Sequence, residues 1–332
     1  PYSSLATGHS TLYFYIILLS LKTFGINTFA LRFPAAIFGI LSVVMFFLIM
    51  KRVFQQFNNE TIKQFLPFLL TFILLSSRWF LNFARFSFEA TFLLFLELVS
   101  IYFLLKFDQV PKAKISNFLR FDVFRQKISV SSFYIFFSGL FSGLAFLSYT
   151  PGRIFFLLPL LFLTLETLRT LKLYKLVYFL IPFIIIITPL TSYLLTNKDT
   201  RIDQQFFLRN HEMTVNGKVN GLWSNISSTT LMLFTKGDMN GRHNYPGKPA
   251  LNPILGILFI IGLIISIKNF KDLYSKIFLL YFLISLFPTI LTYPWENPSM
   301  LRTFTVLSSV IYFIGNAIYH LSAVVQRWSL NK

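Results

Sequence analysis

Apolar residues gather along this chain into long stretches that are separated by short polar connections. A helix that crosses a bilayer needs about 20 apolar residues, with a range of roughly 17 to 25. The two shortest candidates, 65–77 and 154–168, are included because the charge pattern described below fails without them. An all-α polytopic membrane protein with about nine transmembrane helices is therefore predicted, and the spans are 33–50, 65–77, 86–105, 128–149, 154–168, 176–196, 250–267, 277–292 and 303–325.

A further apolar stretch, 12–24, is interrupted by Lys22 and followed by Gly25. It is shorter than a typical span, so we expect a helix that lies in the plane of the membrane interface. A re-entrant segment or a true span is the alternative interpretation.

The connections between the spans alternate between many basic residues and few. One set contains Lys51, Arg52, Lys63, Lys106, Lys112, Lys114, Arg120, Arg125, Lys127, Arg169, Lys172, Lys175, Lys268, Lys271, Lys276, Arg327 and Lys332. Short connections of the other set contain only Arg32, Arg78, Arg85, Arg153 and Arg302. Because short loops rich in Lys and Arg stay in the cytoplasm, the first set and the carboxy terminus are predicted to be cytoplasmic. We expect the plasma (inner) membrane to be the location.

One long connection, 197–249, is predicted to be an exterior loop. It carries seven basic residues, but long loops cross the membrane largely regardless of charge. Its run 237–249 is rich in Asn, Gly and Pro, which favours turns on which a site could be built.

The orientation also places residues 1–31 outside. An odd number of helices, most simply one, is then expected before Pro1. We therefore expect 1–332 to be a single transmembrane domain that lacks the first helix and the first exterior loop.

Composition agrees with a membrane protein and narrows the chemistry. The 332 residues are 55% hydrophobic and only 13% charged, against about 25% in a soluble domain. The net charge of +18 lies in short loops beside the spans, and no groove-reading motif predicts nucleic-acid binding. Absence of Cys excludes disulfides and thiolate metal sites, and His211-Glu212 has no second His at zinc spacing. We predict no metal site and no cofactor, and the sequence does not decide metal dependence.

Clusters of Arg or His with aromatic residues lie at the predicted exterior ends of the spans, at 8–13, 78–89, 149–153, 241–246 and 295–302. A guanidinium group binds phosphate through two parallel hydrogen bonds, and aromatic rings can cover a sugar or an isoprenoid chain. The clusters therefore predict a site for an anionic lipid headgroup. Its candidate residues are Arg85, Glu89, Arg153, Arg242, His243, Asn244, Glu296 and Arg302.

Five of these candidates also have a purely structural interpretation. Arg85 and Glu89 are four residues apart on a predicted helix, where an ion pair needs no ligand. Arg153 could extend to the interface, and Glu296 with Arg302 could form an ion pair that caps the last span.

Several short motifs resemble one family of membrane enzymes. Residues 8–15 (GHSTLYFY), Phe24-Gly25 and 29–36 (FALRFPAA) resemble the stretch that follows the first exterior loop of C-type glycosyltransferases. Residues 78–90 and 296–303 resemble two further motifs of that superfamily. It includes protein O-mannosyltransferases and lipid A aminoarabinose transferases, of glycosyltransferase family 39 and its relatives. The resemblance implies a GT-C-like helical bundle.

It also implies transfer of a sugar from a polyprenyl-phosphate donor to an acceptor on the exterior face. An Asp general base would activate the acceptor, and arginines would stabilise the leaving lipid phosphate. The acidic residues of the family's first exterior loop would lie before Pro1, so this chain alone is expected to be inactive. The resemblance assigns the phosphate role to Arg85, Arg242 and Arg302, an orienting role to Glu89 and Glu296, and a proton or phosphate contact to His243.

Two other classes of protein are weighed against the enzyme. A lipid flippase or transporter would place paired charges and broken helices near the membrane midplane. Glu97, in the middle of a span, is either a packing residue that is neutral or paired, or part of an inner site. A non-catalytic membrane subunit would leave the exterior arginines scattered. The sequence does not name the sugar, the acceptor or the oligomeric state.

Overall fold

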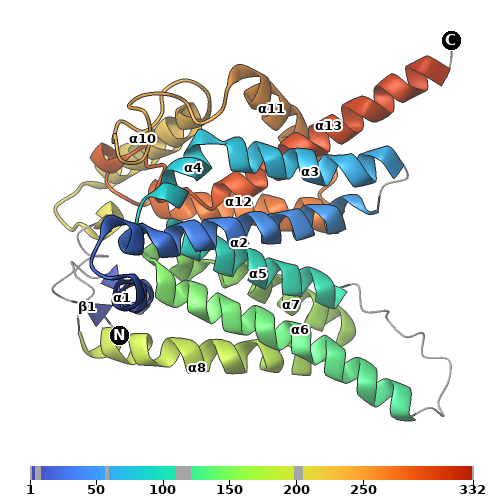
Figure 1. Ribbon diagram of the computed structural model, residues 1–332, viewed down its shortest axis with the longest axis horizontal. Coiled ribbons are helices and arrows are strands. Elements are labelled where there is room, and N and C mark those ends of the chain that lie inside the picture. The colour runs from blue at the N-terminus through green and yellow to red at the C-terminus, as the bar shows by residue number, and fades with distance from the viewer. Residues whose placement is uncertain (1, 4–8, 57–59, 109–120, 198–204, 331–332) are drawn as a thin grey trace.

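The computed structural model describes residues 2–3, 9–56, 60–108, 121–197 and 205–330. In these residues the chain forms a bundle of helices that run along one common axis (Figure 1). The helices of the bundle are α2 (Thr28–Phe54), α3 (Glu60–Ser76), α5 (Ala90–Asp108), α6 (Phe121–Ser148), α7 (Leu157–Thr170), α8 (Tyr174–Thr196), α11 (Pro253–Lys268), α12 (Leu273–Ile290) and α13 (Val306–Leu330).

Each of the nine predicted stretches lies on one of these helices, which confirms the all-α polytopic prediction. Among the described residues, seven helices are long and apolar enough to cross a membrane. An eighth span results if α3 is joined to α4 (Arg78–Arg85), which bends away from it by 59°. The remaining predicted span, α11, has only 16 residues and is a short apolar helix.

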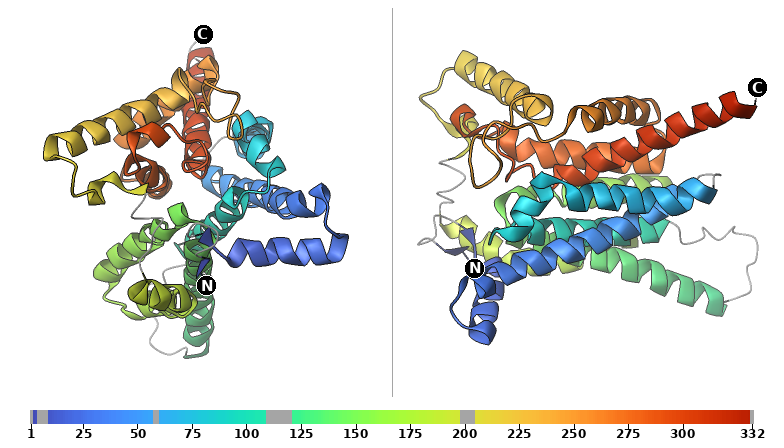
Figure 2. Two further views of the ribbon diagram at one scale, coloured as in Figure 1. Left: turned by 90° about the vertical axis from the view of Figure 1, so that its left-hand side faces the viewer. Right: turned by 45° about the horizontal axis from the view of Figure 1, so that its top comes forward.

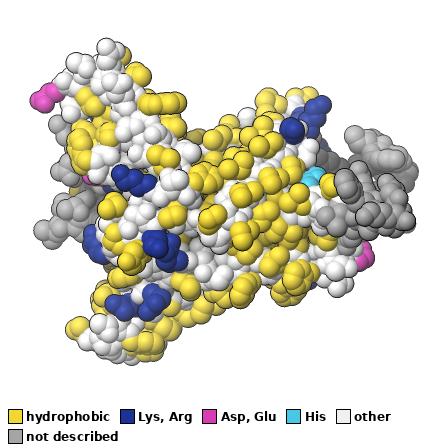
Figure 3. All heavy atoms as spheres, turned by 90° about the horizontal axis from the view of Figure 1, so that it is seen from above, with side chains coloured by type: hydrophobic (Ala, Val, Ile, Leu, Met, Phe, Trp, Pro, Cys, Tyr) yellow, Lys and Arg dark blue, Asp and Glu magenta, His cyan; other side chains and the backbone are white. Residues whose placement is uncertain are grey.

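The connections lie at two opposite ends of the bundle, as the charge alternation predicts. The connections predicted to be exterior gather at the left end in Figure 1, where α4 and α10 also lie. Figure 3 shows Lys and Arg side chains toward both ends of one face, and a broad band without charged side chains between them. A band of this kind is what a lipid bilayer requires. Which end faces the cytoplasm stays a prediction.

Helix α1 (Leu12–Phe24) lies across the bundle axis at the same left end. Figure 1 shows it end-on, whereas Figure 2 (left), which looks along the bundle, shows it lengthwise. The Ser20 hydroxyl donates to the carbonyl of Ala30, 2.6 Å away, and holds α1 against α2. Leu18 and Leu19 stay exposed. This placement agrees with a helix in the membrane interface.

The predicted loop 197–249 contains a helix that the hydropathy pattern missed. Helix α10 (Val215–Phe234) also lies across the bundle axis (Figure 2). Its polarity hides it from a search for spans, but its buried residues recur at helical spacing and are Gly221, Asn225, Thr229, Met232 and Leu233. An exposed apolar stripe runs along another part of its surface and consists of Val215, Val219, Trp223 and Ile226. We therefore expect this face of α10 to contact lipid.

Close approach of helices depends on glycine at two positions. A Cβ atom on Gly262 of α11 would lie 1.7 Å from the carbonyl oxygen of Phe313 in α13. One on Gly139 of α6 would lie 2.2 Å from the carbonyl oxygen of Phe179 in α8. Helices in a membrane associate by van der Waals packing, so small residues at such contacts let the backbones meet.

We expect Gly262→Ala to lower the stability of the purified protein in detergent by about 1–3 kcal/mol, because α11 and α13 must separate. Thermal unfolding measures this. Gly256→Ala on the same helix is the control, because its Cβ would lie 3.3 Å from the Phe234 ring, which can shift. Equal unfolding temperatures for the two variants would contradict the packing argument.

The predicted orientation can be tested because the chain contains no Cys. We expect Tyr245→Cys to react with a membrane-impermeant maleimide in intact cells, and Lys271→Cys to react only after permeabilisation. Both residues are exposed, and the connections that carry them precede and follow α11, so they lie at opposite ends of that helix. The reverse labelling pattern would invert the proposed topology.

Candidate functional site

Glu296 and Arg302 lie on the connection between α12 and α13 and form an ion pair. Glu296 ends the short helix η3 (Pro294–Glu296), and Arg302 lies four residues before α13. The Arg302 Nη1 atom also lies 3.5 Å from the Thr292 hydroxyl. Only 15% of the Arg302 side chain is exposed, against 32% of Glu296, so the guanidinium is largely shielded from solvent. The ion pair considered from the sequence is confirmed.

Arg302 lines a small pocket between three segments of the chain. The other lining residues are Tyr149, Thr150, Pro151 and Ile154 beside and in η1 (Thr150–Ile154), Gln205 and Phe206, and Phe287, Pro288, Leu291 and Thr292 at the end of α12. The pocket encloses about 60 Å³, which is room for about four to six water-sized groups. A phosphate group fits this volume, and a larger ligand would extend out of it.

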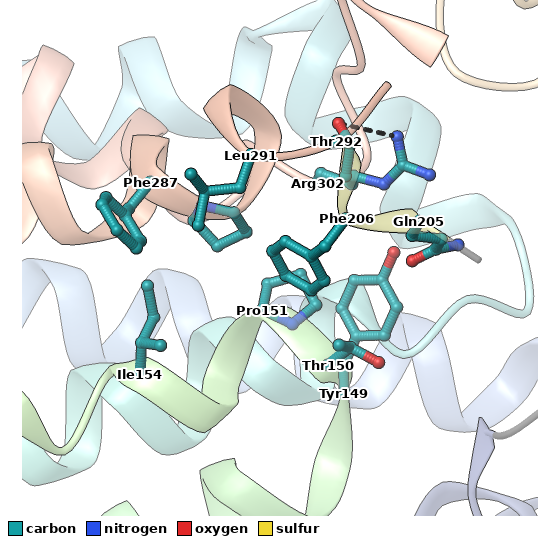
Figure 4. A pocket seen from close by; sticks show the side chains of 11 residues that line it. Tyr149, Thr150, Pro151, Ile154, Gln205, Phe206, Phe287, Leu291, Thr292 and Arg302 are labelled. Carbon is teal, nitrogen blue, oxygen red and sulfur yellow. Dashed lines mark hydrogen bonds between the residues drawn. The ribbon is translucent and has the colours of Figure 1, made fainter. Parts of the chain in front are cut away.

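The pocket has a polar side and an apolar side (Figure 4). Arg302, Thr292 and Gln205 lie on one side of the view, and Phe287 and Ile154 lie on the other. A ligand with an anionic head and an apolar tail therefore meets matching surfaces in this pocket. This is the chemical character predicted for the site from the sequence.

Two amides that were not among the candidate residues hold the pocket wall in place. Asn225 of α10 is fully buried, and its Nδ2 atom donates to the carbonyls of Ile290 (2.8 Å) and Thr292 (2.6 Å). The Asn297 Nδ2 atom donates to the carbonyl of Thr289, 2.9 Å away. Helix α10 thus fixes the end of α12 that lines the pocket. For Asn225, the signal that could have revealed this role is an Asn on the buried face of a polar helix.

The turn 237–249 is organised by the carboxylate of Asp238, which the sequence analysis did not single out. Its Oδ1 atom accepts from the backbone N–H of Asn240 (2.8 Å). Its Oδ2 atom contacts His243 Nδ1 (2.9 Å) and accepts from the backbone N–H of Met300 (2.8 Å). Only 5% of the Asp238 side chain is exposed. Asp238 therefore ties this turn to the connection that carries Arg302.

The same turn docks on α4. Asn82 Nδ2 donates to the carbonyl of Arg242 (2.7 Å), and Arg78 donates to the carbonyl of Pro249 (3.0 Å). The His243 ring lies beside those of Phe83 and Phe88, with centroids 5.8 and 6.0 Å away. His243 thus takes part in packing.

Asn244 also belongs to the structure of the turn. It is 4% exposed, and its Nδ2 atom donates to the carbonyl of Lys248, 2.5 Å away. Arg242, by contrast, presents an exposed side chain. The three neighbouring candidates therefore differ, because His243 and Asn244 stabilise the turn while Arg242 faces solvent.

Arg85 and Glu89 do not share a helix, so an intrahelical ion pair between them is the wrong interpretation. Helix α4 ends at Arg85 and α5 begins at Ala90, with extended backbone at Phe86 between them. Arg85 is exposed, whereas the Glu89 side chain is buried. Burial, and then the negative charge of Glu89, raise the pKa of the Tyr13 hydroxyl above its ordinary value of about 10.

Arg153 lies in η1 beside the pocket but does not line it. It is 9% exposed, so its side chain does not extend to the surface as the alternative interpretation required. Of the candidate residues, Arg302 is the one that lines this pocket. Arg85 and Arg242 are exposed and do not line the pocket. The phosphate role that the resemblance assigned to the three arginines together is therefore wrong for this pocket, and such scatter is also what a non-catalytic membrane subunit would show.

Glu97 lies inside the bundle, on α5, and is 3% exposed. The Tyr281 hydroxyl of α12 donates to its Oε2 atom, 2.6 Å away. This hydrogen bond matches the paired packing residue considered from the sequence. Among the described residues, no three His, Asp or Glu side chains lie close enough together to hold a metal ion.

Two solved structures are similar to this chain. ArnT from Cupriavidus metallidurans bound to undecaprenyl phosphate has a TM-score of 0.61 and 12% identity, over 93% of this chain and 49% of that chain. Archaeal oligosaccharyltransferase AglB from Archaeoglobus fulgidus, in complex with an inhibitory peptide and a dolichol-phosphate, has a TM-score of 0.54 and 14% identity. The match to AglB covers 98% of this chain and 44% of that one.

The chain thus spans about half the length of both structures. No protein-family model and no curated protein matches it. The structural similarities confirm the GT-C-like fold that the sequence motifs implied, and at this identity they establish the fold alone. The protein is a multi-pass membrane protein with this fold.

We expect Asp238→Ala to loosen the turn 237–249, because the Met300 N–H and the His243 ring lose their shared acceptor. A buried donor left unpaired costs about 1–3 kcal/mol, so trypsin should cleave after Arg242 about five to 150 times faster. Limited proteolysis in detergent measures this. Glu212→Ala, which removes an exposed carboxylate, is the control, and equal cleavage rates in both variants would contradict the role of Asp238.

Proposed function

We propose that this protein is a membrane glycosyltransferase that moves a sugar from a polyprenyl-phosphate donor to an acceptor on the extracytoplasmic face. The pocket at Arg302 carries the proposal, because it joins a shielded guanidinium to an apolar wall at one end of the bundle. The similar structures support it, since one is bound to undecaprenyl phosphate and the other to a dolichol-phosphate.

Arg302 is proposed to bind the phosphate of the lipid donor. As the bond between sugar and phosphate breaks, negative charge grows on the phosphate oxygens, and a guanidinium fixed beside them stabilises that charge. Glu296 holds the guanidinium in place before the ligand arrives. Little reorganisation is then needed when the charge develops.

Arg85 and Arg242 are proposed to act at longer range. Both are exposed at the end of the bundle that holds the pocket, where positive charge attracts anionic headgroups. Arg153, Glu89, His243 and Asn244 are proposed to support the site, since they are buried or packed in the segments around it.

No acidic side chain is among the described residues that line the pocket, so donor binding is the step proposed for this chain and no general base is assigned. The protein is proposed to lie in the plasma (inner) membrane with its carboxy terminus in the cytoplasm. A flippase or transporter is the alternative hypothesis. It gains no support from Glu97, because this mid-span carboxylate is hydrogen-bonded to Tyr281.

We expect Arg302→Ala to weaken binding of undecaprenyl phosphate by about 10- to 100-fold, because hydrogen bonds to a charged group contribute about 1.5–3 kcal/mol. Arg302→Lys should be intermediate, since it keeps the charge but loses the two-pronged geometry. Native mass spectrometry of the purified chain with this lipid measures the affinities.

Arg169→Ala is the matched control, because Arg169 is exposed on the predicted cytoplasmic end of α7. Undecaprenol, which lacks the phosphate, should bind the wild type and Arg302→Ala equally. If Arg302→Ala and Arg169→Ala bind undecaprenyl phosphate as tightly as the wild type, the phosphate role of Arg302 is wrong.

A further inference from the structure

Trp295 presents one open aromatic face next to the pocket. It lies in η3, its side chain is 75% exposed, and it stacks on Tyr293 with ring centroids 4.2 Å apart and planes inclined by 22°. Because Tyr293 covers one side of the indole, the opposite side is the one left for a ligand. The stack thus forms a flat apolar surface at the end of the bundle.

Tyr293, the other ring of this stack, is held in place by neighbouring residues. Asn210 Nδ2 donates to the Tyr293 hydroxyl, 3.1 Å away, and the Tyr293 N–H donates to the carbonyl of Gln205, 3.2 Å away. Phe207 packs beside Tyr293 at 6.2 Å between centroids. Since Gln205 lines the pocket, the stack is built onto the pocket wall. An ordered aromatic platform loses little conformational entropy when a ligand binds.

The surroundings of Trp295 differ from those of a residue that anchors a protein in lipid. The indole of Trp223 on α10 lies in a stripe of exposed apolar side chains with Val215, Val219 and Ile226, which suits a membrane interface. Trp295 instead lies in η3, a turn of three residues with no such stripe, between Pro294 and the acidic Glu296. A ligand with both an apolar face and hydrogen-bonding groups matches Trp295 better than a lipid chain does.

We propose that the open face of Trp295 binds a sugar ring. The C–H groups on one face of a sugar carry partial positive charge and are attracted to the electron-rich face of an aromatic ring. The hydroxyl groups at the edge of the sugar can donate to the Glu296 carboxylate, which is one-third exposed.

Chain order makes the sugar and phosphate sites neighbours. Trp295 directly precedes Glu296, and Glu296 is paired with Arg302 in the pocket. The proposed phosphate site at Arg302 and the proposed sugar site at Trp295 thus lie on one short connection, linked through Glu296. This inference rests on the proposed function for the lipid-linked sugar, and an acceptor glycan is the other source of the same chemistry.

The test compares Trp295→Ala, Trp295→Phe and the matched control Trp223→Ala, which removes an equally exposed indole from α10. The probes are undecaprenyl phosphate, undecaprenyl phosphate carrying mannose or glucose, and soluble manno- and gluco-oligosaccharides. We expect at least one sugar-bearing probe to bind about tenfold more weakly to Trp295→Ala, with Trp295→Phe in between. Plain undecaprenyl phosphate should bind all three variants like the wild type.

Loss confined to the lipid-linked sugars assigns the platform to the donor, and loss confined to the oligosaccharides assigns it to the acceptor. Equal binding of every sugar probe by wild type and Trp295→Ala would overturn the proposal. Trp295→Phe removes the fluorescence of one indole, which identifies the emission of Trp295. Strong quenching of that emission by brominated lipids would also overturn the proposal, since Trp295 would then be a membrane anchor.

Failure of the proposed function gives a different result. In that case plain undecaprenyl phosphate would bind wild type and Arg302→Ala equally, whatever Trp295 does. A Trp295-dependent signal from soluble oligosaccharides could still be observed. The two proposals are therefore tested separately by the lipid headgroup and by the sugar.

Discussion

The hydrocarbon interior of a bilayer offers no hydrogen-bond partner to a peptide group, so each backbone segment inside it must satisfy its own donors and acceptors. This constraint makes helices of the apolar stretches and moves the connections to the two ends of the bundle (Figure 1). It also keeps nearly all charged chemistry out of the middle. Glu97, the carboxylate inside the bundle, accepts a hydrogen bond from Tyr281, as buried polar groups require. Any site for an anionic ligand is therefore expected at an end.

At the end that holds the pocket, order depends on a few buried polar side chains. Asp238 links the turn 237–249 to Met300, and Asn225 links α10 to the last turn of α12. Neither residue lines the pocket, yet both fix segments that carry or flank Arg302. Irregular backbone at a bundle end needs such partners, because its N–H and C=O groups are not paired within a helix. Most of these polar residues thus stabilise the fold, and only a few groups at this end are left to bind a ligand.

The groups left to bind a ligand match different parts of one kind of ligand. Arg302 provides shielded positive charge and the end of α12 provides an apolar wall (Figure 4). Trp295 provides an exposed aromatic face. A polyprenyl-phosphate sugar has three matching parts, namely an anionic phosphate, an apolar tail and a sugar ring. The crosswise helices α1 and α10 lie at the same end, where a lipid-borne ligand would leave the bilayer.

The sequence by itself determined the spans, their alternation between two ends and the Glu296–Arg302 pair, because hydropathy, charge and short spacing are local properties of the chain. It also placed the candidate arginines at one end. Only the tertiary structure revealed α10, whose polar sequence hides a helix that packs through small and polar residues, and the break between α4 and α5. It alone showed that Arg302 lines the pocket while Arg85 and Arg242 stay on the surface. The hydrogen bond from Met300 to Asp238 joins residues 62 positions apart, and such contacts arise from packing that no local pattern encodes.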